Sequence, residues 1–238
     1  MNTEATLNKS GSFILSQVGY GQENEIIHPL PFGPGITISQ QAGSGAHTIS
    51  ELTSALLQKS ERPGSPPWRV FDRQLVEKAL EEHDLPKRFA RHMREDRRTY
   101  LEDVTDELCG LRPPSWILVP QVAETIKHLL KGGHVIVVGR GATVITSRMP
   151  GIFHVRLVAS LEKRIERVQN YHNLTLPEAT RYVEGEDRGS RRYVKAHFNA
   201  RIENELLYHL VINTDRVSYE DTAKLIAAGA LQCFAKAE

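Results

Sequence analysis

The sequence contains few cysteines and no histidine motif of the kind found in disulfide-rich or metal-binding proteins. Only two cysteines, Cys109 and Cys233, occur among 238 residues, and they lie far apart without a motif around them. A disulfide between them is one possibility, but two reduced thiols in a cytosolic protein fit this pattern better. The ten histidines form no HxxxH or HExxH pattern, and no metal-ligand spacing involves a cysteine. The sequence therefore predicts no metal site built by protein ligands.

Long apolar runs and an excess of one charge are also absent. No stretch approaches the length of a membrane span, and the N-terminus lacks the basic start and apolar core of a secretory signal. We therefore expect a cytoplasmic protein with no membrane partner. The formal charge of +1 gives no global attraction to nucleic acid. The segment HMREDRR (92–98) is interrupted by two acidic residues and indicates a solvated helix face, so nucleic acid is not an expected partner.

Apolar strand patterns alternate with helical patterns along most of the chain. Residues 1–35 are rich in Ser, Gly, Asn, Gln and Pro and predict a flexible extension. The remainder, 36–238, predicts one α/β domain with a parallel, doubly wound sheet and helices on both faces. The expected strands are 36–39, 68–72, 134–139, 152–159 and 209–214. The expected helices are 46–58, 73–83, 86–109, 116–131, 161–170, 175–197, 199–207 and 218–232.

Ligands of such sheets bind beyond the carboxyl ends of the strands. This rule selects four places: the loop after Ser39, Asp72, the turn 139–141 and the turn after Thr214. In the first loop, Gly43 and Gly45 allow a tight turn that presents N–H groups to an anion, and the dipole of the following helix favours negative charge. The alternative is a strand-to-helix turn that uses glycine only for its geometry.

The side chains of this first loop differ from those of an ordinary phosphate-binding loop. Ala46 stands where such loops carry a lysine that follows the β and γ phosphates, and His47 stands where a hydroxyl holds magnesium. Thr48, one residue later, and Ser44 each offer a hydroxyl nearby. The loop thus predicts anion binding by its backbone without the usual point charge.

Two arginine-bearing segments supply candidate cations. Arg140 lies between two glycines after the most apolar strand, where a guanidinium is well placed to bind phosphate; an ordinary surface turn is the alternative. The segment EGEDRGSRRYVK (184–195) carries Arg188, Arg191 and Arg192. Its two glycines each weaken a helix by about 1 kcal/mol and favour a mobile lid. A solvated helix face, with Glu184 and Asp187 four residues before two of the arginines, remains the alternative.

The order and spacing of these motifs, from about Ile36 to Leu231, resemble the cytidylate kinase-like family, a branch of the P-loop nucleoside monophosphate kinases. The matching segments are ITISQQAGSGAHTISELTSALL, VFDRQLVEKAL, VIVVGRGATVI, FHVRLVASLEKRIERV, EDRGSRR and LVINTDRVSYEDTAKLI. The resemblance implies a five-stranded parallel sheet with a helical lid at about 175–200. It also implies transfer of the γ-phosphoryl group of ATP, assisted by Mg²⁺, to CMP or a related nucleoside monophosphate.

The same resemblance assigns roles to residues. It places Asp72 and Arg140 at the acceptor. Arginines of the lid stabilise the charge on the moving phosphoryl group, a catalytic role that falls to Arg188, Arg191 and Arg192. The donor phosphates would be cradled by Gly43, Ser44, Gly45, Ala46, His47 and Thr48.

The chain also departs from this family. True cytidylate kinases have lysine in place of Ala46 and a base-contacting aspartate in place of Gly141. The cytidylate kinase-like branch commonly lacks the lysine too, and tends to read SREYGSGGRE; here Gln40 and His47 replace its two arginines. Loss of one preorganised donor costs about 10²–10³ in rate. Two alternatives to an active nucleotide kinase therefore stay open: a catalytically impaired nucleotide-binding regulatory module, and a small-molecule kinase with a different acceptor. The sequence leaves the oligomeric state unknown.

Overall fold

The structure is a computed structural model that describes residues 33–72, 115–139 and 141–236. Its centre is one five-stranded sheet in which every pair of neighbours is parallel and the strand order is β2-β3-β1-β4-β5. This confirms the predicted parallel sheet. The strands are β1 (Gly35–Gln40), β2 (Arg69–Phe71), β3 (Val135–Val138), β4 (Ile152–Val158) and β5 (Leu210–Asn213).

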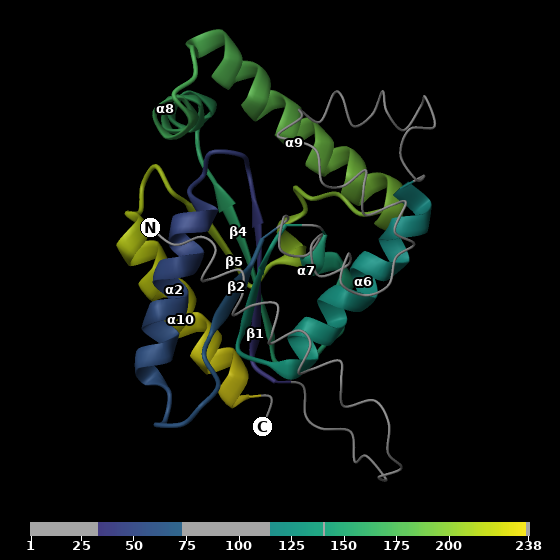
Figure 1. Cartoon of the computed structure of the whole chain (residues 1–238), viewed down its shortest axis with the longest axis vertical. Helices are drawn as coiled ribbons and strands as arrows, with labels where there is room; N and C mark the ends of the chain where they lie inside the picture. Colours follow the sequence, from purple (N-terminus) through teal and green to yellow (C-terminus); the bar gives the residue numbers. More distant parts are fainter. Residues whose placement is uncertain (1–32, 73–114, 140, 237–238) are drawn as a thin grey trace.

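Helices cover both faces of the sheet and one of its ends (Figure 1). α2 (Ala46–Ser60) and α10 (Tyr219–Ala235) pack side by side on one face. α6 (Ser115–Gly132) and the short α7 (Ala142–Ile145) lie on the other face. α8 (Leu161–His172) and α9 (Leu176–Phe198) pack against each other beyond the sheet, at the top of Figure 1. A short 3-10 helix, η1 (Glu205–Leu207), precedes β5.

Successive side chains of each strand point to opposite faces of the sheet, so the sheet has an apolar core on each face. Alternate residues of β1, such as Ile36 and Ile38, face α2 and α10, whereas Thr37 and Ser39 point to the opposite face. The core under α2 and α10 includes Ile36, Ile38, Ile49, Leu57, Ile136, Val138, Val155, Leu157, Ile212 and Ile226. The core under α6 includes Phe71, Val122, Ile126, Leu130, Val135, Val137, Ala142 and Ile152.

The prediction for the region after α9 needs one correction. The helix expected at 199–207 is wrong: α9 ends at Phe198, Asn199 adopts a left-handed conformation with φ of 48°, and only the three residues of η1 are helical before β5. Asparagine tolerates this conformation and often ends a helix. The helix expected at 175–197 is present as α9, which runs continuously through Gly185 and Gly189, and the mobility of this lid segment stays a prediction. The helices predicted at 73–83 and 86–109 lie outside the described residues.

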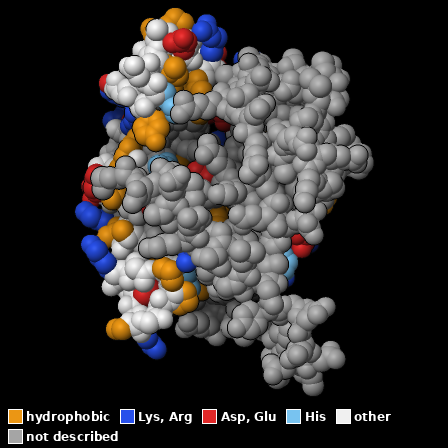
Figure 2. All heavy atoms as spheres, viewed as in Figure 1, with side chains coloured by type: hydrophobic (Ala, Val, Ile, Leu, Met, Phe, Trp, Pro, Cys, Tyr) orange, Lys and Arg blue, Asp and Glu red, His pale blue; other side chains and the backbone are white. Residues whose placement is uncertain are grey.

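The structure bears only in part on the predicted location and on the predicted state of the cysteines. None of the described helices is long and apolar enough to cross a membrane, and the cytoplasmic location stays a prediction. Cys233 is a free, half-buried thiol, whereas Cys109 lies outside the described residues. Figure 2 shows basic, acidic and apolar side chains intermixed along the described part of one face, without a concentrated basic patch there.

A buried polar cluster lies on the sheet face opposite α2 and α10. Thr37 Oγ1 lies 2.7 Å from His154 Nδ1 and 3.0 Å from Thr143 Oγ1. The backbone N–H of His154 donates to Nδ1 of His209, whose ring stacks on that of His154. Burial, and then the charge of His209, lower the pKa of His154 from 6.5 to about 4. His154 is therefore neutral in the folded protein at neutral pH.

We predict that this histidine makes the fold sensitive to mild acid. Because the folded-state pKa of about 4 lies below the ordinary 6.5, the unfolded chain binds the proton more tightly, and the free energy of unfolding falls as pH decreases from about 6.5 to about 4. The expected loss at pH 5 is about 2 kcal/mol. Urea unfolding at pH 7.5 and 5 measures it.

The His154→Asn variant should lose most of this pH dependence. His128→Asn, at an exposed position of α6, is the matched control and should retain the wild-type dependence. An unchanged dependence in His154→Asn would show that other groups cause the acid sensitivity.

Candidate functional site

The loop between β1 and α2 turns on two glycines with positive φ. Gly43 has φ of 79° and Gly45 has φ of 89°, values that L side chains rarely adopt. The first bond within α2 runs from the N–H of Ile49 to the carbonyl of Gly45, at 3.0 Å. The N–H groups of the residues just before Ile49 therefore have no partner within the helix. These groups and the positive end of the α2 dipole make this loop suited to an anion.

The side chains of the loop are divided between the interior and the surface. Ala46 packs in the apolar core and is 1% exposed, whereas His47 and Thr48 are exposed. Ser44 is fully buried, and its Oγ has no hydrogen-bond partner. Of the two hydroxyls considered for magnesium, that of Thr48 is at the surface and that of Ser44 is enclosed. Ala46 therefore makes apolar contacts at the position of the usual lysine. Any positive charge next to a bound phosphate must come from residues outside the loop.

Asp187 of α9 and Arg164 of α8 bind the backbone of the loop at Ala42. The N–H of Ala42 donates to Asp187 Oδ1 at 2.9 Å, and Arg164 Nη1 donates to Asp187 Oδ2 at 2.7 Å. The same Nη1 lies 3.1 Å from the carbonyl oxygen of Ala42, so both backbone groups of Ala42 are bound. The Arg164 and Asp187 side chains are only 6% and 12% exposed. We call this arrangement the clasp; it fixes α8 and α9 to the phosphate-binding loop.

The three predicted lid arginines follow the clasp along α9. Arg188, Arg191 and Arg192 are all exposed, and the last lies about 7.5 Å along the helix axis from Asp187. Arg191 forms a long contact of 3.9 Å with Glu203, and both side chains are about half exposed. Neither of the other two takes part in an ion pair within the described segments. Asp187, expected to offset the charge of Arg191, instead bonds to Arg164 and the loop.

Of the two predicted acceptor residues, Asp72 is among the described residues. Asp72 directly follows β2, which pairs with β3, and β3 leads into the turn at Gly139. Asp72 is half-buried and has an interaction partner. Arg140 lies outside the described residues. Gly141 has φ of 68°, and a Cβ built there would lie 2.8 Å from Cε2 of Phe198, at the end of α9. A side chain at 141 would therefore require the Phe198 ring to move aside.

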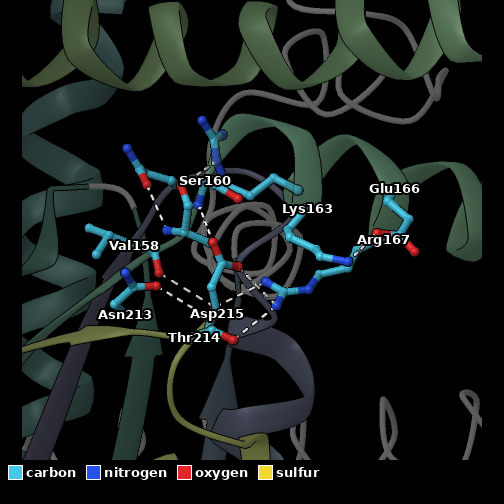
Figure 3. Close-up of polar contacts among 11 residues, drawn as sticks. Val158, Ser160, Lys163, Glu166, Arg167, Asn213, Thr214 and Asp215 are labelled. Atoms are coloured by element: carbon cyan, nitrogen blue, oxygen red, sulfur yellow. Dashed lines mark hydrogen bonds and ion pairs between the residues drawn. The ribbon is translucent and has the colours of Figure 1, made fainter.

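A polar cavity of about 280 Å³ opens at the turn after β5, next to the loop; it is lined by Lys163, Glu166, Arg167, Asn170 and Asp215. Figure 3 shows Asp215 at its centre, accepting a bond from the N–H of Ser160 at 2.7 Å and facing Arg167 at 3.2 Å. Burial opposes ionisation of Asp215, but the Ser160 bonds and the charge of Arg167 prevail and lower its pKa. Arg167 also binds the carbonyl of Thr214 at 2.9 Å.

Tyr219 connects this cavity to the phosphate-binding loop. The guanidinium of Arg167 lies 5.5 Å from the centre of the Tyr219 ring. On its other side the ring fills the space next to Gly45, where any added Cβ would overlap it. Sequence reasoning selected the turn after Thr214 but missed Arg164, Arg167 and Tyr219. The spacing of the two arginines, three apart in a helix that follows a sheet strand, is a signal that could have found them.

The described residues contain no group of three or more His, Cys, Asp and Glu side chains that could hold a metal ion.

We predict that breaking the clasp destabilises the protein strongly. Asp187→Ala leaves the buried Arg164 without its carboxylate, and loss of one partner of such a pair costs about 3–5 kcal/mol. Urea unfolding of wild type and variant measures this. The control is Glu124→Ala, which removes an exposed ion pair with Lys127 and should cost about 0–1 kcal/mol. Equal losses in the two variants would contradict a structural role for the clasp.

Comparison with known proteins supports the fold seen here. A structure of an uncharacterized protein from Eubacterium ventriosum is 14% identical, with 82% of this chain and 96% of that chain covered and a TM-score of 0.59, a likeness of fold alone. The shikimate kinase of Acinetobacter baumannii, solved with shikimate, is 16% identical, with 85% and 95% covered. Its TM-score of 0.43 is too low to support any conclusion.

A sequence relative covers a much smaller part of the chain. The uronate isomerase of Corynebacterium glutamicum is 29% identical over 91 residues, which are 38% of this chain and 18% of the isomerase. The chain therefore spans less than a fifth of that relative, and the isomerase activity has no bearing on the site described above.

The chain also matches a protein family over most of its length. Residues 35–216 match the cytidylate kinase-like family. This range takes in the phosphate-binding loop, all five strands and the whole of α9. The chain therefore belongs to the cytidylate kinase-like family and has its P-loop kinase-like fold.

Proposed function

We propose that this protein transfers the γ-phosphoryl group of ATP to CMP or a related nucleoside monophosphate. The observation that carries the proposal is the clasp, because it sets an arginine-bearing helix directly against a glycine turn with free N–H groups. Asp187 touches the loop at Ala42, and the next residue of α9 is Arg188. A phosphoryl group at the loop would therefore lie beside a row of cations, as transfer chemistry requires.

The donor side would use the backbone more than side chains. Gly43, Ser44, Gly45, Ala46, His47 and Thr48 would cradle the phosphates of ATP, chiefly through backbone N–H groups; that of Ser44 already donates to the carbonyl of Gln41 at 3.1 Å. The magnesium ion that ATP carries would neutralise phosphate charge, and the exposed hydroxyl of Thr48 is the loop group suited to contact its water shell. The cavity beyond Tyr219 would take the remainder of the nucleotide, where Arg167 and Asp215 offer hydrogen-bond partners.

The catalytic cations would come from α9. With Ala46 in the apolar core, the loop offers no lysine to the γ-phosphate. Arg188 and Arg192 are exposed and lie on one side of the helix, four residues apart, and Arg191 is held only by a long, exposed contact. In the proposed reaction these three arginines stabilise the charge that spreads over the equatorial oxygens during transfer. Residues of about 175–200 thus serve as the lid of the domain 36–238.

The acceptor side favours a broader choice of substrate than a true cytidylate kinase has. Asp72 and Arg140 would bind the acceptor, but Phe198 fills the space that an aspartate at 141 would need. Loss of that base contact favours a second candidate, a kinase of another small molecule. The apolar surroundings of Ala46 favour a third, a regulatory module that binds nucleotide without turnover.

We predict monophosphate-dependent release of ADP from Mg-ATP when CMP, dCMP, UMP, AMP and GMP are supplied in turn. The double variant Arg188→Ala/Arg192→Ala should lower turnover at least 100-fold, the order expected for lost transition-state donors, and leave the Kd for ATP within about threefold. Arg181→Ala, an exposed position earlier on α9, is the control. Retained ATP binding without turnover for any acceptor in the wild type would favour the regulatory module.

We also predict that Gly45→Ala abolishes the rise in melting temperature that ATP produces by mass action, because the new Cβ overlaps Tyr219 and distorts the loop. Gly64→Ala is a close control: Gly64 has a similar φ of 93°, but a Cβ there meets no atom within 4 Å. Both variants carry the same backbone strain, and only the first disturbs the loop. An undiminished response to ATP in Gly45→Ala would contradict phosphate binding at this loop.

A further inference from the structure

β4 carries an arginine, Arg156, at a buried position where packing alone would favour an apolar residue. Arg156 is 6% exposed and lies in register with Ser39 of β1 on one side and Val211 of β5 on the other. By the alternation of the strand, its side chain shares the polar face of the sheet with His154 and is opposite the core of α2 and α10. An apolar residue would be expected at a position so enclosed.

The protein satisfies little of the hydrogen-bonding capacity of Arg156. Its Nη1 donates to Ser39 Oγ at 2.7 Å, and its guanidinium lies 5.7 Å from the centre of the Tyr208 ring. The Tyr208 hydroxyl lies 2.8 Å from the carbonyl of Ile202 and 3.2 Å from Ser39 Oγ. The single tyrosine proton is shared between these two acceptors, and Ser39 Oγ accepts from both Tyr208 and Arg156. Among the described residues, the guanidinium of Arg156 makes no hydrogen bond besides the one from Nη1 to Ser39, although it carries five N–H donors.

No described carboxylate compensates the charge of Arg156. The ion pairs among the described residues do not include it, and no carboxylate stands beside it on its strand. Two residues back on the same face is His154, which is neutral at pH 7 because burial lowers its pKa to about 4. On β5 the facing residue is Val211. A buried cation without an anion costs several kcal/mol, so an anion that arrives from solution would bind here with a large gain.

The position of Arg156 allows such an anion to arrive at the candidate site. Ser39 is the penultimate residue of β1, just before the chain enters the phosphate-binding loop. The N–H of Gln41 in that loop binds the carbonyl of Leu157, the neighbour of Arg156, at 3.0 Å. Val211, on the same face at the edge of the sheet, is 44% exposed. Arg156 therefore lies at the ligand end of the strands, next to a face that solvent reaches.

We infer that Arg156, fixed by Ser39 and Tyr208, forms an anion subsite that binds the phosphate or carboxylate group of the acceptor. The inference rests on the proposed function, since it gives that acceptor its anionic group. The planar guanidinium offers two parallel N–H donors to two oxygens of the anion. Ser39 and Tyr208 act as positioning residues that orient the arginine.

A direct test follows the Nε–Hε resonance of Arg156 by NMR in the full-length wild type, assigned with the Arg156→Lys variant. Titration with inorganic phosphate, and separately with acetate, should shift this resonance saturably, while chloride at equal ionic strength should not. If neither anion moves it more than chloride does, the subsite is overturned.

The second test compares affinities for CMP and for cytidine, which lacks the phosphate. Arg156→Met should weaken CMP binding at least tenfold and leave cytidine binding unchanged, since a bond to a charged group contributes about 1.5–3 kcal/mol. Arg148→Met, at an exposed position, is the control. In buffer without phosphate, Arg156→Met should melt no lower than the wild type, because it removes a charge that no described carboxylate compensates; a marked loss of stability there would instead show that Arg156 is structural.

The two proposals fail separately. An Arg156 resonance that responds to phosphate in a protein without phosphotransfer would keep the subsite and overturn the kinase. Turnover with CMP and unchanged CMP affinity in Arg156→Met would keep the kinase and overturn the subsite.

Discussion

A single carboxylate, that of Asp187, joins three parts of the chain that are distant in sequence. It accepts from the N–H of Ala42 in the loop and from Arg164 of α8. Because the pair is almost fully enclosed, its members cannot separate cheaply into water. The position of α9 relative to the loop, and with it the position of the arginines on α9, follows from this contact. Apolar packing between α8 and α9, through Ile165 and Val183 among others, supports the same arrangement.

The two faces of the sheet differ in polarity. The face under α2 and α10 is apolar throughout and anchors the helix that follows the loop. The other face carries an apolar core only under α6, and becomes polar toward β4, where Thr37, His154 and Arg156 are buried. Buried polar groups demand partners, and these three side chains hydrogen-bond across the sheet, His154 to Thr37 and Arg156 to Ser39.

Features with local causes could be predicted from the sequence. The five strands were found because short apolar runs alternate with helical patterns, most clearly at 134–139, where a β-branched run ends at glycine, and the loop because its glycines suit positive φ. The clasp could not be found, since Asp187 lies 145 residues from Ala42 along the chain, and an aspartate among arginines suggests a local ion pair. The expected helix at 199–207 failed for a local reason, because Asn199 ends α9 in a left-handed conformation. The roles of Phe198, Tyr219 and Arg156 depend on partners that only the folded chain brings near.

The contact between Gly141 and Phe198 couples two positions that lie far apart in the chain. A side chain at 141 would keep a φ of 68° and would require the ring of Phe198 to move aside. The residue at the end of α9 therefore limits which side chains the turn after β3 can carry. Any redesign of this turn has to treat 141 and 198 as a pair rather than as two independent positions.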